Sequence, residues 1–356
     1  MKPRLNKLYK KLREEKIDAL LVTKDVNVSY LSGFHGTEAC ALCSPAANFL
    51  ITDSKYATST KDEVAGFKVK IRDGSIYRIL KELCRKLGIE RLGFESKWLS
   101  YNEHRRLNDE LKRLNLVATL DLVEAIREIK GASEIGFIKR AVKISDRTYR
   151  SLLDFIKPGM SEEEVAREID HLLRLNGAEA NSFPTIAISG KRSSLPHGRP
   201  THKRIGPNDP VMIDFGARCK GYCSNLTRMV FLGRMSRKFR RIYEWVLNAQ
   251  MKAIGKLKPE VKISDIDRAA RQYLERKGVG KYFCHRLGHG VGMEIHEEPS
   301  ISQTNKVRLK EGMVFTIEPA VYIPGWGGVR IEDMVLVTRG GVEILSNSPK
   351  QMINIG

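Results

Sequence analysis

Five residues in the second half of the chain have side chains that could do metal chemistry: Asp214, Asn225, His289, Glu318 and Glu332. Carboxylates and imidazoles are common donors to divalent cations. Glu318 and Glu332 each stand inside an apolar stretch, where a lone carboxylate is costly unless it is paired or binds a metal. We therefore predict that the four ionisable residues are ligands of a pair of metal ions, while Asn225 offers only a neutral amide.

The first two of these residues fall in a predicted β-hairpin. Residues 211–216 read as a strand that enters a turn, and residues 221–231 read as the strand that leaves it. A hairpin of this length can bring Asp214 and Asn225 side by side on one face.

The two glutamates fall in a second predicted hairpin. Residues 314–322 and 329–337 are apolar strands on either side of a turn rich in glycine. Glu318 and Glu332 can then face each other across the strands. The sequence therefore predicts a pseudo-symmetric core with a metal site between two hairpins.

Three of the eight histidines, His285, His289 and His296, lie close together among glycines. A lone histidine is more often structural than a ligand. Glycine, however, lets backbone segments approach closely, and two acid-bearing hairpins accompany this cluster. We therefore predict that the cluster belongs to a functional site.

The elements that must position these residues follow a two-part plan. Residues 1–130 alternate helical and strand patterns, which indicates a sheet flanked by helices. In this part we expect helices over 5–15 and 77–86, strands over 19–23, 49–52 and 91–95, and a turn over 24–27.

The second part begins after a predicted linker at residues 129–133. A long helix follows, and the Ser161 to Glu164 spacing predicts a capping box at the start of the next helix. From about residue 182 strands and hairpins alternate with two more helices, expected over 237–256 and 263–277.

The composition limits the class of protein. The chain has 356 residues, 42% of them hydrophobic, and a formal net charge of +20 from 62 basic and 42 acidic residues. The basic residues are spread along helical segments, which predicts a solvated basic surface and does not favour nucleic acid as a partner. No apolar run is long enough to span a membrane, and the start is basic with helical spacing, unlike a signal peptide. We predict a cytoplasmic protein without membrane contact.

Six cysteines are present, and Cys40 and Cys43 form a lone CxxC pair. No second CxxC or paired histidine motif completes a zinc site. The pair also does not follow a strand and precede a helix, as a thioredoxin-type redox pair does. We expect reduced, partly buried thiols.

The motifs together resemble those of the M24 metallopeptidases, which have the pita-bread fold and include prolidase, aminopeptidase P, methionine aminopeptidase and the metal-free creatinase. Residues 27–34 resemble the creatinase-type N-terminal domain, which favours prolidase or aminopeptidase P. The resemblance implies an α+β architecture: a creatinase-like N-terminal α/β domain over residues 1–130, then a pita-bread catalytic domain of pseudo-symmetric α/β hairpins over 131–356. The motifs that carry it are Pro196-His197-Gly, Asp214-Phe-Gly, Gly288-His289-Gly, Thr316-Ile-Glu318-Pro and Arg330-Ile-Glu332-Asp.

By this resemblance, Asp214 would bind one metal ion, whereas His289 and Glu318 would hold the other. Glu332 would bridge the two ions, with Asn225 beside it. An oxygen-rich site with one imidazole suits Mn²⁺ or Co²⁺, with Zn²⁺ as a further candidate. Two ions about 3.5–4 Å apart would deprotonate a shared water. The resulting hydroxide would attack the peptide carbonyl, and Glu318 would move its proton.

The resemblance also implies roles for the accessory residues. His197 and His296 resemble residues that bind the substrate and stabilise the tetrahedral intermediate. Arg330 would orient metal ligands and substrate; the alternative is an exposed strand arginine. His285 would shape the substrate pocket or have a purely structural role.

Asn225 departs from the family pattern, which has aspartate at this position. An amide is neutral, and its NH₂ group repels a cation. Loss of outer-sphere partners typically costs about 10–100-fold in metal affinity, so a lost ligand should cost at least as much. One of the two ions is therefore expected to be weak or absent.

Three functions follow from this mismatch. The first is metal-dependent hydrolysis of a peptide with proline in the second position, as in Xaa-Pro dipeptidase or aminopeptidase. The second is a catalytically inactive pita-bread protein that binds nucleic acid or a protein partner. The third is a metal-independent amidinohydrolase like creatinase, against which the retained His289, Glu318 and Glu332 argue. The resemblance further implies a homodimer and leaves open whether dipeptides or longer peptides are the substrate.

Overall fold

The structure of the chain is a computed structural model that describes residues 2–355. These residues form two compact units that separate between Arg127 and Glu128. We refer to residues 2–127 as the N-terminal unit and to residues 128–355 as the C-terminal unit.

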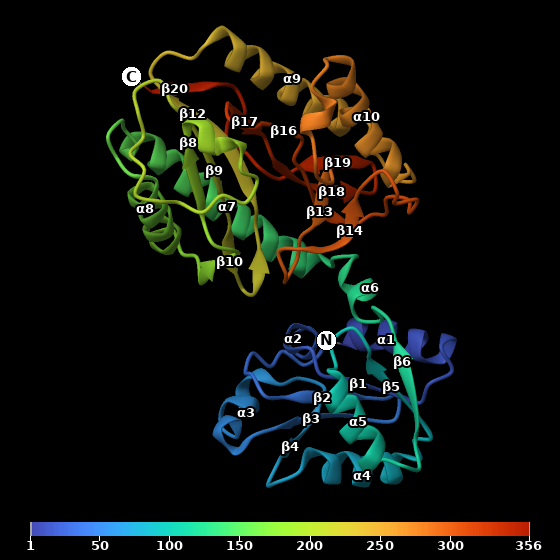
Figure 1. The fold of residues 1–356 in the computed structure, drawn as a ribbon. Coiled ribbons are helices and arrows are strands. Elements are labelled where there is room, and N and C mark those ends of the chain that lie inside the picture. Colours follow the sequence, from blue (N-terminus) through green and yellow to red (C-terminus); the bar gives the residue numbers. More distant parts are fainter. Residues whose placement is uncertain (1, 356) are drawn as a thin grey trace. The chain divides into compact units, whose positions relative to one another are not determined.

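The N-terminal unit is a six-stranded sheet with the strand order β4-β3-β2-β1-β5-β6. Helices α4 and α5 lie on one face of this sheet and α1 on the other (Figure 1). The predicted strands over 19–23, 49–52 and 91–95 and the two predicted helices are confirmed within a few residues. The elements are α1 Lys2–Glu14, β1 Ala19–Val22, α2 Asp25–Ser32, β2 Cys40–Cys43, β3 Asn48–Thr52, α3 Ser59–Glu63, β4 Lys68–Ile71, α4 Ile76–Leu87, β5 Arg91–Glu95, α5 Tyr101–Glu110, β6 Asn115–Thr119 and α6 Glu124–Arg127.

The predicted turn over residues 24–27 is wrong, because α2 begins at Asp25. The carboxylate of Glu95, at the end of β5, accepts hydrogen bonds from the backbone N–H groups of Thr23 and Lys24 at 2.7 and 2.8 Å. It also accepts one from the side-chain amide of Asn27 at 2.7 Å. Glu95 thus satisfies polar groups at the start of α2. Because Glu95 is far from α2 along the chain, the sequence did not reveal this contact.

The cysteines of the structure are free thiols, as predicted. Cys40 and Cys43 both lie on β2 and are buried. Burial raises the pKa of the Cys40 thiol to about 12, so it stays protonated and unreactive at neutral pH.

The C-terminal unit begins with α7 Ala132–Phe155, followed by the predicted capping box at Ser161 and α8. Ser161 accepts from the N–H of Glu164 at 3.1 Å, and Glu164 accepts from the N–H of Ser161 at 2.6 Å. The two later helices also match the predicted spans. The remaining elements are α8 Glu162–Leu175, β7 Ala180–Asn181, β8 Ile186–Ser189, β9 Pro210–Phe215, β10 Ala217–Cys219, β11 Tyr222–Cys223, β12 Leu226–Leu232, α9 Arg237–Ile254, α10 Ile263–Arg276, β13 Gly288–Gly290, β14 Glu297–Ile301, β15 Val314–Ile317, β16 Ala320–Ile323, β17 Gly327–Arg330, β18 Asp333–Thr338, β19 Gly341–Ile344 and β20 Ile353–Ile355.

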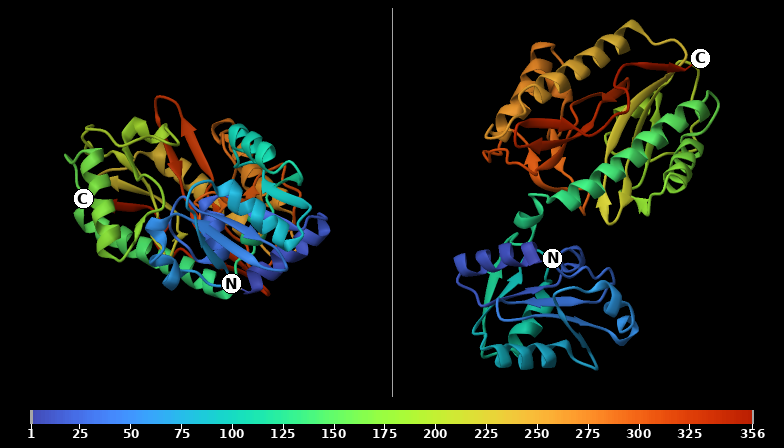
Figure 2. Two further views of the ribbon diagram at one scale, coloured as in Figure 1. Left: turned by 90° about the horizontal axis from the view of Figure 1, so that it is seen from below. Right: turned by 180° about the vertical axis from the view of Figure 1, so that it is seen from behind.

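Strands occupy the middle of the C-terminal unit, with a pair of helices on each side (Figures 1 and 2). Helices α7 and α8 share an apolar core with β8, β9 and β12. Helices α9 and α10 share a second core with β14 and with β15 to β18. The strand layer between these two cores carries the predicted metal ligands.

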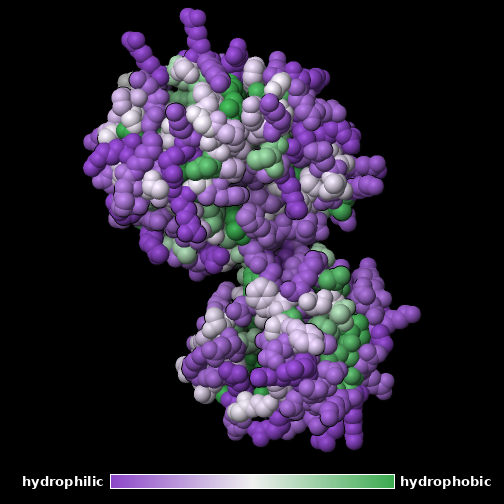
Figure 3. Space-filling model, viewed as in Figure 1, coloured by the Kyte–Doolittle hydropathy of each residue, from purple (hydrophilic) through white to green (hydrophobic). Residues whose placement is uncertain are grey.

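Hydrophilic side chains cover most of the visible face of each unit (Figure 3). This agrees with the 29% of charged residues in the sequence, since charged groups remain in water. Across residues 2–355, every helix is too short or too polar to cross a membrane.

Candidate metal centre

Glu318 and Glu332 lie opposite each other where a β-ladder is interrupted. The predicted strand over 314–322 is two strands, β15 and β16, on either side of Glu318 and Pro319. Pro319 has no N–H to continue the ladder. The register is nevertheless the same on both sides, since Ile317 pairs with Asp333 and Ala320 pairs with Arg330.

The backbone of each glutamate is held by a residue outside this ladder. The N–H of Glu318 donates to the Leu287 carbonyl at 2.8 Å, and the N–H of Glu332 donates to the Thr227 carbonyl at 3.2 Å. The side chains then converge. Glu332 is fully buried, and Glu318 keeps 15% of its side chain exposed.

His289 completes a cluster with the two glutamates. The ligating atoms of His289, Glu318 and Glu332 all lie within 4.8 Å of one another. The Nδ1 of His289 donates to the Gly290 carbonyl at 3.0 Å, which leaves Nε2 with a lone pair facing Glu318 Oε1 at 3.4 Å. Burial lowers the pKa of this imidazole, which therefore remains neutral and able to bind a cation.

The glycines beside His289 are needed for close packing. A Cβ atom at Gly288 would collide with the carbonyl oxygen of Thr316, and one at Gly290 would collide with that of Glu298. Short strand β13 can therefore lie against β14 and β15 and bring His289 to the glutamates.

Asp214 lies on β9 opposite Thr227 of β12, and Asn225 lies just before β12. The predicted hairpin thus forms, but Thr227 is the direct partner of Asp214. Asp214 Oδ2 accepts from Arg330 Nη2 at 2.5 Å. The side-chain nitrogen of Asn225 lies 3.4 Å from His289 Nε2, so Asn225 is in contact with the cluster.

Three buried oxygen atoms at this centre have no hydrogen-bond partner among residues 2–355: Asp214 Oδ1, Asn225 Oδ1 and Glu332 Oε1. A buried acceptor without a partner is costly. Burial raises the pKa of Glu332 well above its ordinary value, and the negative charge of Glu318 adds to that effect. A divalent cation would satisfy both the unpaired oxygens and the crowded carboxylates, so the residues fit a metal site.

Arg330 is 3% exposed, so the alternative of an exposed strand arginine is wrong. Besides Asp214, it donates to the Thr227 hydroxyl at 3.1 Å, the Tyr322 hydroxyl at 2.6 Å and the Pro196 carbonyl at 3.0 Å. Arg330 therefore fixes Asp214 and also the backbone just before His197.

The three accessory histidines surround the centre to different degrees. His285 contacts the Tyr322 hydroxyl through Nε2 at 3.2 Å, and burial lowers its pKa. His296 is exposed and packs its ring against that of His289 at 4.3 Å between centroids. The ring next to His289 is nevertheless partly shielded from water, and this desolvation, together with the nearby His289 and His197, lowers the pKa of His296 to about 4. His197 is exposed, and it lies close enough to His285 and His296 to lower the pKa of both.

Comparison with known proteins agrees with this geometry. The profile described as metallopeptidase family M24 matches residues 136–339, and that of the creatinase/prolidase N-terminal domain matches residues 4–129. The chain belongs to metallopeptidase family M24. The predicted family, enzyme class and fold are confirmed.

Several relatives of this M24 chain resemble it over its whole length. An Xaa-Pro dipeptidase from Pyrococcus furiosus is 39% identical over 358 residues, which cover 99% of this chain and 100% of that protein. A solved Xaa-Pro dipeptidase from Bacillus anthracis has a TM-score of 0.96 at 38% identity and covers 99% of both chains. A solved X-Pro aminopeptidase from Thermotoga maritima has a TM-score of 0.90 at 36% identity, with 96% of this chain and 100% of that chain covered.

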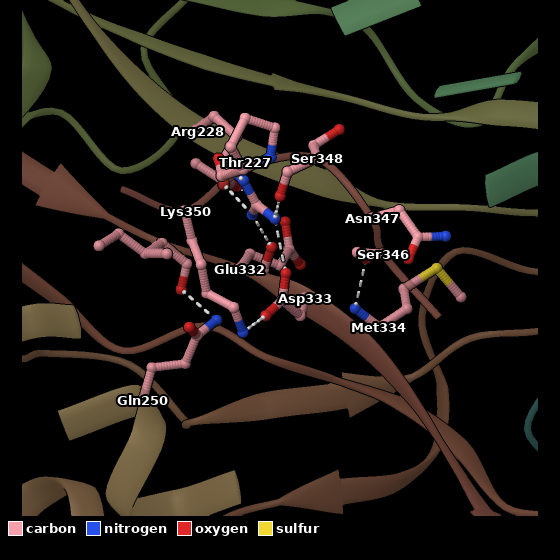
Figure 4. A network of polar contacts seen from close by, with 12 residues as sticks. Thr227, Arg228, Gln250, Glu332, Asp333, Met334, Ser346, Asn347, Ser348 and Lys350 are labelled. Carbon is pink, nitrogen blue, oxygen red and sulfur yellow. Dashed lines mark hydrogen bonds and ion pairs between the residues drawn. The ribbon is translucent and has the colours of Figure 1, made fainter. Parts of the chain in front are cut away.

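Sequence reasoning missed two residues of the M24 centre that lie on β12. The Thr227 hydroxyl donates to Glu332 Oε2 at 2.7 Å. Arg228 is 1% exposed; it donates to the carbonyl of Glu332 and to Asp333 Oδ1, the latter at 2.6 Å (Figure 4). Two adjacent polar residues inside the apolar run 226–232 were the available signal, because such residues need buried partners.

Proposed function

We propose that this chain is a metal-dependent Xaa-Pro peptidase of the M24 family. The observation that carries the proposal is the convergence of His289, Glu318 and Glu332 beside buried oxygens that have no partner among the described residues. The names of the similar dipeptidases and aminopeptidase supply the substrate class, a peptide with proline in its second position.

His289, Glu318 and Glu332 would hold one divalent ion, and Asp214 and Asn225, with Glu332 between, would hold a second. Mn²⁺ or Co²⁺ suits this donor set, with Zn²⁺ as a further candidate. When bound, such ions lower the pKa of water and polarise the scissile carbonyl.

Glu318 is the residue proposed to move the proton. Burial raises the pKa of its carboxyl above the ordinary value. A carboxyl with a raised pKa is a better proton acceptor, so Glu318 can accept a proton from the attacking water and later release it to the leaving prolyl nitrogen. The Thr316 hydroxyl donates to Glu318 Oε1 at 3.1 Å and orients the group.

The histidines are proposed to bind the substrate. His296 and His197 are exposed, so they can donate to the carbonyl of the bond that breaks. His285 reaches the centre through Tyr322, which in turn contacts Arg330. These contacts can fix the wall of the substrate pocket.

Asn225 is expected to weaken the second ion. Its carbonyl oxygen is neutral, and its NH₂ group faces His289 Nε2, the atom that would bind the first ion. The amide therefore competes with one ion and binds the other poorly. Homodimer formation stays a prediction from the family resemblance, and a cytoplasmic location stays a prediction from the sequence.

The test is hydrolysis of an Xaa-Pro dipeptide and an Xaa-Pro tripeptide with added Mn²⁺ or Co²⁺, together with a count of bound metal. The matching Xaa-Ala dipeptide is the substrate control. We expect turnover of the proline substrates alone. A natural chain that is inert and binds no metal, while Asn225→Asp hydrolyses the same peptides, would overturn the proposal in favour of a binding protein.

A further inference from the structure

Helix α9 contributes a buried side chain that none of the roles above accounts for. Gln250 is 0% exposed and points from α9 toward the strands that carry the two glutamates (Figure 4). Its side-chain nitrogen donates to the carbonyl of Ile317 at 3.1 Å and to that of Ile331 at 3.3 Å. One amide therefore bridges the two residues that immediately precede Glu318 and Glu332.

The two carbonyls belong to the peptide units that carry the glutamates. Each unit is held on its nitrogen side, with Glu318 bonded to Leu287 and Glu332 bonded to Thr227. Gln250 holds the carbonyl side of both units. The ladder between β15–β16 and β17–β18 is interrupted at this point, where the N–H of Ile331 reaches the carbonyl of Pro319 only at 3.5 Å. Strand pairing therefore holds the two peptide units more weakly here than in a continuous ladder.

The orientation of the amide follows from its surroundings. Both neighbours are carbonyl oxygens, which accept hydrogen bonds, so only the NH₂ group of Gln250 can face them. Its Oε1 has no partner among residues 2–355, although it is buried. An apolar side chain would avoid that penalty, so the two donated bonds are the reason for a glutamine here.

We propose that Gln250 is a positioning residue that sets the separation of Glu318 and Glu332 and so pre-forms the metal centre. The role in forming a metal centre rests on the proposed function. The two hydrogen bonds of Gln250 do not depend on it. Of the two glutamates, Arg228 donates to the backbone of Glu332. Gln250 instead links the peptide units that lead into both glutamates.

The first test uses metal-free protein and compares Gln250→Met with Val246→Ala. Methionine fills similar space without the donors, and Val246 is a fully buried core residue one turn earlier on α9. We expect amide hydrogen exchange in peptides spanning 314–323 and 327–338 to rise by about fivefold or more in Gln250→Met. In Val246→Ala, the exchange rate of these peptides divided by that of the peptides of β8 and β9 should stay unchanged.

The second test measures binding of Co²⁺ and its visible absorption spectrum. Gln250→Met is expected to weaken the tighter ion by about 10-fold or more and to change the spectrum, because outer partners orient metal ligands. Val246→Ala should keep the spectrum of the natural chain. If Gln250→Met fails to fold, Gln250→Asn, which is one methylene shorter, takes its place with the same expected direction.

The outcomes separate this inference from the proposed function. A natural chain that binds no Co²⁺ and cleaves no peptide would overturn the function, while the exchange measurement would still decide the role of Gln250. Unchanged exchange in the Gln250 variant would overturn the positioning role. Faster exchange with an unchanged Co²⁺ spectrum and affinity would reduce Gln250 to a stabilising residue and would also overturn it.

Discussion

The two halves of the candidate centre differ in what their side chains already contact. In the half built on β13, β15 and β18, His289 and two glutamates converge, and their ligating atoms fit within 4.8 Å. In the half built on β9 and β12, the carboxylate of Asp214 is held by Arg330 at 2.5 Å, and its neighbour Asn225 is an amide. The first half crowds two carboxyl groups together, whereas the second has one carboxylate that is paired with an arginine.

This difference indicates that a pseudo-symmetric scaffold can hold an asymmetric site. Each half includes an antiparallel strand pair, but Glu318 lies directly opposite Glu332, whereas Asp214 lies opposite Thr227. Affinity for a cation depends on the charge that each half leaves unpaired rather than on hairpin geometry. We therefore expect one tight ion at His289, Glu318 and Glu332, and a weak one at Asp214 and Asn225.

The largest effect is expected from Glu332→Gln, which removes charge from the tight half while keeping its shape. Metal affinity should fall by more than about 100-fold, and peptide hydrolysis should be lost with it. Isothermal titration with Mn²⁺ and an Xaa-Pro assay would measure both losses. Full turnover in this variant would contradict the assignment of the centre.

The same variant tests whether the Glu332 carboxyl makes the stability of the metal-free protein depend on pH. Because the folded-state pKa of Glu332 is raised above 4.5, the native protein holds a proton that the unfolded chain releases. The free energy of unfolding should therefore decrease as pH rises above that value. Glu332→Gln should flatten this decrease in urea unfolding measured at several pH values; an unchanged slope would argue against a strained carboxyl.

The next largest effect concerns the half that contains Asp214 and Asn225. Arg330→Met leaves Asp214 buried without its charged partner, which should cost about 3–5 kcal/mol of unfolding free energy in metal-free protein. Added Mn²⁺ should reduce this loss, because a cation can replace the arginine beside Asp214.

The matched control is Arg271→Met. Arg271 pairs with the fully buried Asp267 at 2.8 Å on α10. Its loss should destabilise the fold to the same extent with or without Mn²⁺. If Mn²⁺ changes the loss of unfolding free energy equally in both variants, the ion does not act at Asp214.

Local signals allowed much of the fold to be predicted from the sequence. The capping box at Ser161, the apolar strand runs and the hairpins all depend on residues close together in the chain. The start of α2 was not predictable, because its stabilising partner Glu95 is 72 residues from Thr23.

The candidate ligands could be named from the sequence, whereas their contacts could not. Family motifs named the residues proposed as ligands. The pairing of Thr227 with Asp214 depends on a strand register that the sequence does not specify. The burial of Arg330 and the reach of Gln250 depend on how α9 and the strand layer pack together. Such long-range packing leaves no local pattern in the chain.

The smallest effect on the centre is expected from Cys40→Ser in the N-terminal unit. Cys40 lies on β2, and no cysteine belongs to the candidate metal cluster that residues 2–355 form. Metal affinity should stay unchanged, although burial of a hydroxyl should cost about 1–3 kcal/mol of stability. A loss of bound metal would reveal a second site that includes the CxxC pair.

The most direct test of the asymmetric centre is a calorimetric Co²⁺ titration of the natural chain and of Asn225→Asp, with Asn225→Ala as control. The natural chain should bind one tight ion, and Asn225→Asp should bind a second at least about 10-fold more tightly than the natural chain does. Asn225→Ala should not gain the second ion. Two equally tight ions in the natural chain, or no change in Asn225→Asp, would contradict the account.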